Sequence, residues 1–492
     1  MQDWEFSLLG SRIFFCGRSP RHRQTFYSRS IVCAHKKTTA SNRTSAYYKY
    51  YKQQQHHTLS ATMMKILLCG GGNAIHVLSS YCSSRDDTHV TVLSLFPGEA
   101  DKLRDAIPDE GIRCINDLGD DVYGKPNAII SKAEDVPKDL DIVVFALPSF
   151  THEMYLKALK PDLKPGVTIG AMPGEGGFDL CAIHNLGSEF CRHSNLFALE
   201  TLPWACRIEE YGKKVEVLGT KKEVEVIVSP KHGTTKNEVV TEVLHKLVGR
   251  LPELDPADNF LAVTLMNINS VWHPTISYGF YRKRDVTVPF DEPPLFYYGA
   301  DEYTGEKLSL ISDEVLEVKR VLLGKYPSLH LDSLHHVSEW MLRSYGDDIG
   351  DKTSIYTMLR TNKGYRGLTH PMREVQVDGQ TKYLPNFRYR YFTEDLPMGL
   401  VVTRGIAELA GVKTPHMDDV ILWCQEMLDK EYLVDGELKG KDLESTRAPQ
   451  RYGFKDLDTF MKVNHYLDDD APTKAVENHV SSFATKGETP AQ

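Results

Sequence analysis

The first half of the chain carries short, continuous apolar runs that alternate with helix-like segments. The clearest runs lie at 65–69, 90–93, 141–146 and 167–170. Strands that are apolar on both faces and joined by helices are typical of a parallel sheet covered on both sides. Two later segments, 214–219 and 223–228, alternate charged with aliphatic residues, as edge or antiparallel strands do. The pattern therefore predicts an α/β domain over residues 64–257.

The pattern changes near Pro256, where apolar residues take up helical spacing. Segments with this spacing lie at 259–272, 313–323, 334–345 and 400–410, with few strand signals between them. We therefore predict a mainly α-helical second domain over residues 258–470. The last segment, 471–492, is polar and contains Pro472 and Pro490, so we predict a disordered tail there.

The segment 1–63 differs from both predicted domains. It carries ten Lys and Arg residues but only two acids, whereas the whole chain has a net charge of -9, so the remainder is strongly acidic. Richness in Arg, Ser and Tyr partly fits a transit peptide, but no clear amphipathic helix is present. We interpret this segment as a disordered or targeting-like extension, with Met63 or Met64 as the working start.

Composition narrows the possible partners and sites. An acidic body lacks the cations that displace phosphate counterions, so we expect neither nucleic acid nor an anionic membrane as a partner. No apolar run approaches the roughly 18 residues that predict a bilayer span. The nine cysteines include no C-x-x-C pair, so we predict no metal site, and we expect reduced thiols in a cytoplasmic protein.

The sequence "MKILLCGGGNAIH" joins the first predicted strand to a helix-capable segment through three glycines. Such a turn lets backbone N–H groups and a helix N-terminus hold a pyrophosphate, as in Rossmann-type dinucleotide-binding domains. The predicted cofactor-binding residues are Gly70, Gly71, Gly72, Asn73 and Ala74. Ile75 stands where a third small residue is usual, and a plain glycine-rich turn is the alternative interpretation.

The choice between NAD and NADP rests on the end of the second strand. An acid there would bind the ribose hydroxyls of NAD, but the strand ends in Ser94-Leu95-Phe96, and the nearest acid is Glu99. No basic residue stands there to pair with a 2′-phosphate. These residues therefore leave the choice between NAD and NADP open.

Several blocks of sequence together resemble the invertebrate opine dehydrogenases, from Met64 to about Lys462. The blocks are "CGGGN", "ETLPWACRI", "VEVLGTK", "VWHP", "RYFTEDLPMG", "EYLVDGELKGKD" and "RYGF". The resemblance implies a Rossmann-type domain, a helical domain and an active site between them. It also implies a monomeric enzyme that joins an amino acid to pyruvate and reduces the imine with NADH, regenerating NAD in anaerobic glycolysis.

The same resemblance implies roles for individual residues. His273 matches the catalytic histidine of the family, Asp395 the carboxylate paired with it, and Arg390 the arginine near the reacting carboxylate. Glu200 and Cys206 fall where the amino-acid substrate is bound. Arginine, alanine, glycine, taurine and β-alanine are all candidate amino acids.

The residues alone allow less specific interpretations. An imidazole suits proton transfer near neutral pH, and a guanidinium suits a keto-acid carboxylate. However, His273 could instead be a buried histidine of the core before Pro274. Asp395 could instead cap the N-terminus of a helix. If 387–391 is extended, Arg388 and Arg390 lie on the same face, and Arg388 is then expected to point into solvent. Glu200 could pair with Arg207 and not with a substrate. The role of Glu175 is left open.

Two other functions remain possible at this stage. One is a two-domain reductase of a keto or hydroxy acid, like the ketopantoate or glycerol-phosphate dehydrogenases. Those enzymes usually rely on a lysine in the helical domain, and no lysine here has a comparable setting. The other is a non-catalytic NADH-binding protein, which the joint presence of His273, Arg390 and Asp395 disfavours.

Overall fold

The computed structural model describes residues 63–117, 119, 121–249, 251–257 and 259–466 of the 492-residue chain. All of these residues except Met63 belong to one compact unit that begins at Met64. The predicted extension, apart from Met63, and the predicted tail at 471–492 lie outside the described residues.

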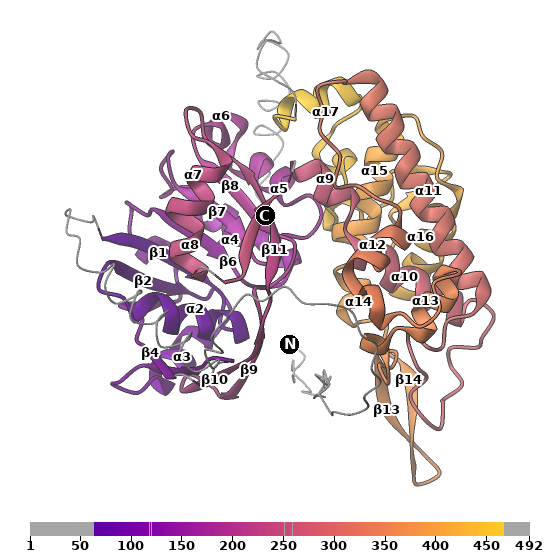
Figure 1. Ribbon diagram of the computed structural model, residues 1–492, viewed down its shortest axis with the longest axis horizontal. Coiled ribbons are helices and arrows are strands. Elements are labelled where there is room, and N and C mark those ends of the chain that lie inside the picture. Colours follow the sequence, from indigo (N-terminus) through magenta and orange to yellow (C-terminus); the bar gives the residue numbers. More distant parts are fainter. Residues whose placement is uncertain (1–62, 118, 120, 250, 258, 467–492) are drawn as a thin grey trace, which may run out of the picture. The chain divides into compact units, whose positions relative to one another are not determined.

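An eight-stranded sheet organises the first part of the chain (Figure 1). Its spatial order is β12-β11-β8-β7-β6-β1-β2-β5, and the strands from β8 to β5 all pair in parallel. Their bounds are β1 Met64–Cys69, β2 Thr88–Leu93, β5 Ala128–Ile130, β6 Ile142–Phe145, β7 Thr168–Ala171, β8 Asn195–Leu199, β11 Glu223–Ser229 and β12 Glu253–Pro256. The four apolar runs of the sequence are thus β1, β2, β6 and β7, and the predicted α/β fold is confirmed.

The continuous apolar runs arise because both faces of this sheet are covered. On β1, Ile66 and Leu68 belong to one hydrophobic core, whereas Leu67 and Cys69 belong to the other. The first core includes residues of α2 (Asn73–Ser83), α3 (Glu99–Ala106) and α8 (His245–Val248). The second includes residues of α4 (His152–Leu159), α5 (Phe178–Leu186) and α6 (Ser188–Arg192). Because successive residues are buried on opposite faces, these strands lack the alternation of polar and apolar residues that a half-exposed strand shows.

A second, four-stranded sheet was not predicted as such. Its order is β4-β3-β10-β9, with β3 at Ile112–Ile115, β4 at Asp121–Gly124, β9 at Trp204–Glu210 and β10 at Lys214–Thr220. The two strands expected at 214–219 and 223–228 are β10 and β11, and each has an antiparallel neighbour. Neither is an edge strand, because β10 lies between β3 and β9, and β11 between β12 and β8.

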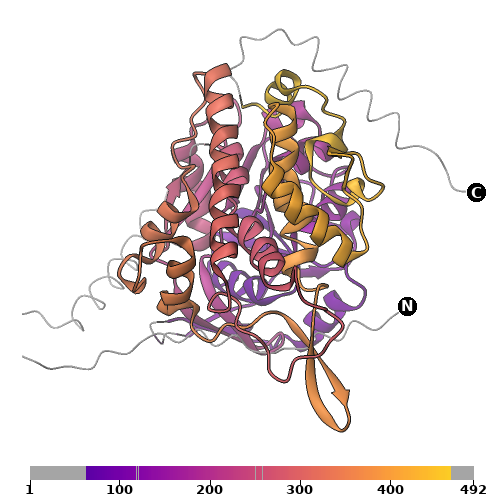
Figure 2. The same ribbon diagram turned by 90° about the vertical axis from the view of Figure 1, so that its right-hand side faces the viewer.

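The second part of the chain is mainly helical, as predicted (Figure 2). Its longer helices are α9 Phe260–Leu265, α10 Ile268–Tyr281, α11 Glu302–Lys325, α12 Val337–Tyr345, α13 Ile355–Thr361, α15 Val401–Leu409, α16 Pro415–Leu428 and α17 Leu457–Val463. The segment expected as one helix at 259–272 is broken, because the Asn267 side chain accepts a hydrogen bond from Ser270 N and caps α10. A hairpin of β13 (Met372–Val377) and β14 (Gln380–Pro385) was not predicted.

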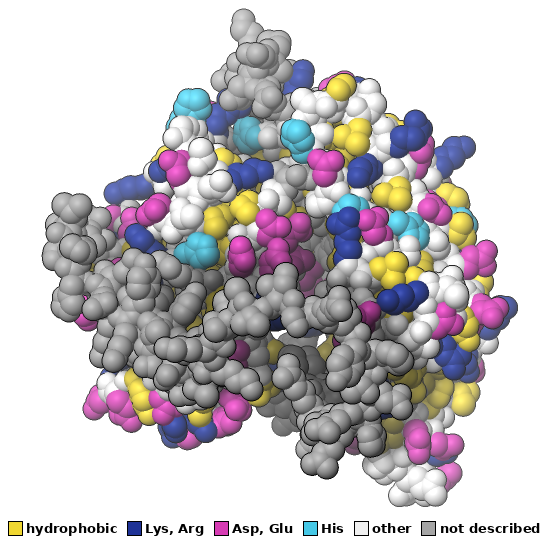
Figure 3. Space-filling view, viewed as in Figure 1, with side chains coloured by type: hydrophobic (Ala, Val, Ile, Leu, Met, Phe, Trp, Pro, Cys, Tyr) yellow, Lys and Arg dark blue, Asp and Glu magenta, His cyan; other side chains and the backbone are white. Residues whose placement is uncertain are grey.

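The described helices include none that is both long and apolar enough to cross a membrane. On the face shown in Figure 3, Lys and Arg side chains are scattered among Asp and Glu side chains.

Candidate active site

The glycine turn after β1 has the geometry of a dinucleotide-binding loop. Gly70 has φ +120°, and a Cβ there would lie 3.2 Å from the carbonyl oxygen of Ala146, which follows β6. Nothing lies within 4 Å of a Cβ built on Gly72. No side chain caps the N-terminus of α2, and no acid lies in its first turn. Its backbone N–H groups and positive dipole are therefore available to a pyrophosphate.

The neighbours of these glycines have structural roles. The Asn73 side chain accepts a hydrogen bond from Ile208 N at 2.8 Å, which fixes its amide beside the glycine turn. Ala74 and Ile75 are buried, and Ile75 Cγ1 lies 3.4 Å from a Cβ built on Gly70. The α2 helix thus accommodates Ile75 where a smaller residue is usual. The residues present fit a bound dinucleotide.

Glu99 supplies the acid that the end of β2 lacks. It is the first residue of α3, and Gly98 before it has φ +74°, which turns the chain back toward the glycine loop. A Cβ built on Gly71 would lie 2.5 Å from the Glu99 carboxyl carbon. Ser94, directly after β2, donates a hydrogen bond to the same carboxylate. The sequence identified Glu99 only as the nearest acid; Gly98 before it is the signal that could have placed it beside the glycine turn.

His273 and Asp395 form a buried pair. His273 Nδ1 lies 2.6 Å from Asp395 Oδ2, and the residues are 7% and 6% exposed. The Tyr391 ring stacks on the imidazole with 3.6 Å between ring centroids. Asp395 precedes the π-helical turn η6 (Leu396–Leu400) but forms no side-chain cap, so its alternative role as an N-cap is wrong. Within the described part of the chain, His273 Nε2 has no hydrogen-bond partner.

Glycine at position 399 allows these two segments to meet. A Cβ built on Gly399 would lie 2.1 Å from Ser270 Cβ, so any side chain there would clash with α10. Ser270 is one helical turn before His273, and Gly399 is one turn after Asp395. The close approach of η6 to α10 thereby brings the carboxylate to the imidazole.

Arg390 lies beside this pair at the start of α14 (Arg390–Thr393). Its Nε donates to Glu394 Oε2 at 2.5 Å, and its side chain is 57% exposed. Among residues that the structure describes, its terminal nitrogens have no hydrogen-bond partner. The prediction of an extended segment at 387–391 is therefore wrong, because a turn closed by the hydrogen bond from Tyr389 N to Asn386 O leads directly into the helix at Arg390. Arg388 is exposed, as its solvated-face interpretation predicts.

Glu175 completes a cluster of acids around Arg390. It lies in the loop between β7 and α5 with φ +55°, a conformation that is strained for a non-glycine residue. Asn267 Nδ2 donates to its carboxylate at 2.9 Å. Burial and the nearby carboxylates of Asp395 and Glu394 raise the pKa of Glu175 to about 7. At neutral pH this side chain therefore titrates.

In the part of the chain that the structure describes, the predicted substrate residues Glu200 and Cys206 form no hydrogen bond with the pair of His273 and Asp395. Glu200 is exposed and accepts a hydrogen bond from Glu225 N at 3.2 Å. Cys206 is buried on β9, and burial raises the pKa of its thiol to about 11. In the described residues neither side chain hydrogen-bonds to the His273 pair, and Arg207 donates to the Cys206 carbonyl. Their roles at an amino-acid site stay predictions.

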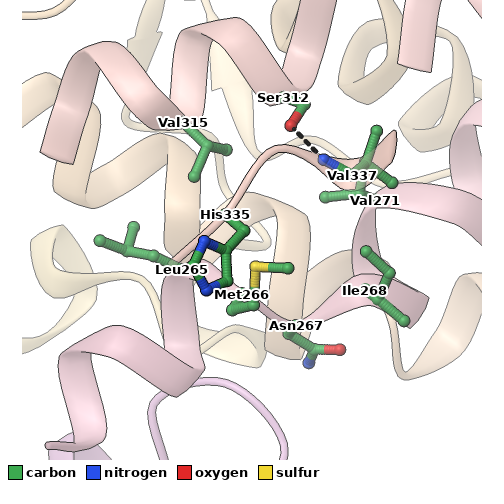
Figure 4. Close-up of a pocket in the computed structure, with 9 residues that line it drawn as sticks. All are labelled: Leu265, Met266, Asn267, Ile268, Val271, Ser312, Val315, His335 and Val337. Carbon is green, nitrogen blue, oxygen red and sulfur yellow. Dashed lines mark hydrogen bonds between the residues drawn. The ribbon is translucent and has the colours of Figure 1, made fainter. Parts of the chain in front are cut away.

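A small pocket lies behind Asn267, on the side of the helical domain (Figure 4). Its lining is Leu265, Met266, Asn267, Ile268, Val271, Ser312, Val315, His335 and Val337. Ser312 Oγ accepts from Val337 N, and most of the other lining side chains are apolar. The pocket contains neither His273 nor Arg390, and we do not assign it to the reaction. The described residues also contain no group of three side chains suited to a metal ion.

The arrangement as a whole can move a proton and bind an anion. An imidazole that donates Nδ1–H to a carboxylate presents Nε2 for proton transfer. A guanidinium held through Nε keeps its other edge for a planar carboxylate. Both groups lie where helical-domain residues meet the loops after β6 and β7, the end of the sheet at which α/β folds bind ligands.

Comparison with known proteins identifies close relatives. A family model for the α-helical domain of NAD/NADP octopine/nopaline dehydrogenases matches residues 256–428. The chain is 39% identical over 403 residues to the opine dehydrogenase of Haliotis discus hannai, covering 80% of this chain and 98% of that protein. It is 38% identical to the tauropine dehydrogenase of Arabella iricolor, with the same coverage.

Solved structures give the same result. Octopine dehydrogenase in complex with NADH and L-arginine superposes with a TM-score of 0.76 at 36% identity, covering 83% of this chain and all of that one. The same enzyme with NADH and pyruvate gives a TM-score of 0.73 at 35% identity. The likeness therefore extends over both the sheet and the helical part.

Proposed function

Because the chain belongs to the opine dehydrogenase family, we propose that it reductively condenses an amino acid with pyruvate. In the reaction the amino group and the keto carbon of pyruvate form an imine with loss of water. A hydride and a proton then convert the imine to a secondary amine. Pyruvate, a protonated amine, NADH and a proton thus give the opine, NAD and water.

NADH, when bound, supplies the hydride. The residues that would hold it are Gly70, Gly71 and Gly72, with the backbone at the start of α2 for the pyrophosphate. The Glu99 carboxylate beside Gly71 suits the ribose hydroxyls of NADH and repels a 2′-phosphate. This residue therefore supports NADH over NADPH.

The His273 and Asp395 pair is the single observation that best supports the chemistry. Nε2 of the imidazolium donates a proton to the departing oxygen, and Asp395 stabilises the charged ring through Nδ1–H. Arg390 binds the pyruvate carboxylate through its two terminal nitrogens, which keeps the keto carbon close to Nε2.

Two further residues would meet the amino acid. Glu200 would attract its cationic end, and Cys206 would line the same site by way of β9. The relatives differ in the amine that their names indicate, so arginine, alanine, glycine, taurine and β-alanine all remain candidates. We propose in addition that the enzyme acts as a monomer in the cytoplasm, where it regenerates NAD in anaerobic glycolysis.

The test is an assay with pyruvate, NADH and each of the five amines in turn. The proposal predicts loss of nicotinamide absorbance with at least one amine and only slow loss with pyruvate alone. Rapid loss without an amine would instead indicate a keto-acid reductase. No turnover with any amine, in folded protein that binds NADH, would count against catalysis altogether.

A further inference from the structure

Glu394 is a buried carboxylate that contacts both domains beside Arg390. It is 1% exposed, and Oε1 accepts hydrogen bonds from both N and Oγ of Ser149, each at 2.7 Å. Its other oxygen, Oε2, accepts from Arg390 Nε at 2.5 Å. Ser149 begins the short helix η2 (Ser149–Thr151) that follows β6. One side chain therefore spans from the loop after β6 to the arginine of the helical domain.

Ser149 is also held from its other side. Arg447, which is 1% exposed, donates from Nη2 to Ser149 O at 2.7 Å. From Nη1 it donates to Gly174 O and Gly176 O, at 3.2 and 3.1 Å. The loops after β6 and β7 are thus fixed together by a helical-domain side chain. Because both loops lie at the carboxyl end of the sheet, their positions decide where a ligand there sits.

The bond from Arg390 to Glu394 also fixes the orientation of the guanidinium. A guanidinium is planar, so occupation of Nε by a carboxylate determines where the two terminal nitrogens point. Those nitrogens have no hydrogen-bond partner in the part of the chain that is described. The edge formed by the two terminal nitrogens can then bind a second carboxylate in bidentate geometry.

We propose that Glu394 is a positioning residue that sets the place of the Arg390 guanidinium relative to the loop at Ser149. This inference rests on the proposed function, because it assumes that Arg390 binds the keto-acid carboxylate. As a consequence, the keto carbon is held at a fixed position relative to the loops at the carboxyl end of the sheet. Reactions between two bound groups depend steeply on such placement.

Only a glutamate satisfies all three donors. A carboxylate offers acceptors on both oxygens, whereas glutamine would point an NH₂ group at either Ser149 or Arg390. Aspartate is one methylene shorter and cannot contact both. Glu394→Gln therefore breaks the contact either with Ser149 or with Arg390. Ser149→Ala removes the hydrogen bond from the serine hydroxyl and keeps the one from the backbone N–H.

The matched control is Glu153 on α4. Its Oε2 accepts from Arg451 Nη2 at 2.5 Å, so this glutamate also joins the two domains, but it does not contact Arg390. Glu153→Gln removes the charge from a comparable bond between the domains without affecting the Arg390 guanidinium. It therefore separates loss of positioning from general loosening.

The experiment measures NADH affinity by fluorescence and pyruvate affinity by calorimetry on the NADH-loaded protein, together with KM and kcat in the amine assay. For Glu394→Gln we expect the pyruvate Kd and KM to rise about tenfold or more, with NADH affinity unchanged. Ser149→Ala should show a smaller rise in the same parameters. Glu153→Gln should leave the pyruvate affinity within about twofold of the wild type.

Three results would overturn the inference. The first is wild-type pyruvate affinity in both Glu394→Gln and Ser149→Ala, in a protein that turns over normally. The second is a parallel loss of pyruvate and NADH affinity in all three variants, which would indicate that Glu394 only holds the two domains together. If the wild type itself neither binds pyruvate nor turns over, the proposed function fails and the inference with it. Should Glu394→Gln not fold, Ser149→Ala decides.

Discussion

Nδ1 of His273 lies 2.6 Å from Oδ2 of Asp395, although 122 residues separate them in the chain. The first is in the middle of α10, and the second precedes η6. The contact is buried, and among the described residues Asp395 is the hydrogen-bond partner of the ring, so the carboxylate favours the tautomer with its proton on Nδ1. This geometry supports the proposed role of Nε2 as the general acid.

The dyad predicts strongly non-additive substitutions. His273→Ala should lower kcat by about 10²-fold or more and leave NADH affinity nearly unchanged. Asp395→Asn should also lower kcat, because the amide no longer stabilises the imidazolium. Since the two residues act as a unit, the double variant should be no slower than His273→Ala. Additive losses in kcat, or a parallel loss of NADH affinity, would contradict the dyad; exposed Asp313→Asn is the control.

Arg390 and Arg388 provide a matched pair of arginines. Arg390→Lys should raise the KM for pyruvate by about tenfold or more, because lysine cannot bind a carboxylate in bidentate geometry. Arg388→Lys should change little, because among the described residues no hydrogen bond joins its side chain to Glu394 or to the His273 pair. Steady-state kinetics with pyruvate varied at saturating NADH measures both. An equal effect of the two substitutions would remove Arg390 from the site.

Glu99 predicts the cofactor preference. Glu99→Gln removes the charge that repels a 2′-phosphate, so the ratio of the NADPH Kd to the NADH Kd should fall by about tenfold. The control is Asp101→Asn on the same helix, whose carboxylate pairs with Arg104 at 2.7 Å. Fluorescence titration with each dinucleotide gives the ratio. An unchanged ratio in Glu99→Gln would show that the acid does not face the ribose.

Glu175 predicts a pH-dependent stability. Because its pKa is raised from the ordinary range to about 7 in the folded protein, the native state binds an extra proton between about pH 4.5 and pH 7. The cost of ionising this buried group is absent below that window and fully present above it. Glu175→Gln should therefore raise the Tm at pH 8 relative to the wild type, with a much smaller difference at pH 5. Thermal unfolding monitored at several pH values tests this; a difference that does not vary with pH would contradict it.

The strands of the main sheet were predictable because their burial on both faces is written into continuous apolar runs. The break between α9 and α10 was not, since the cap at Asn267 interrupts a segment whose apolar spacing is helical throughout. The β13 and β14 hairpin was missed because it is largely exposed and carries no apolar face of its own. Pattern alone identifies elements that bury a face.

The candidate site shows a similar division. His273, Asp395 and Arg390 were reached through the family resemblance and lie together. Glu394 was missed because the alternation of arginine and aromatic residues at 387–391 suggested an extended segment, which hid the helical spacing from Arg390. Its contact with Ser149, 245 residues away, depends on how the two domains pack and has no local signal.

The most direct test of the central claim follows a deuterium atom from the cofactor. The protein is incubated with pyruvate, the preferred amine and NADH carrying deuterium at the transferred position, and the products are analysed by mass spectrometry. We predict a secondary amine with deuterium on the carbon that joins the former keto group to nitrogen. Deuterated lactate as the main product, with no deuterium in a secondary amine, would contradict the account.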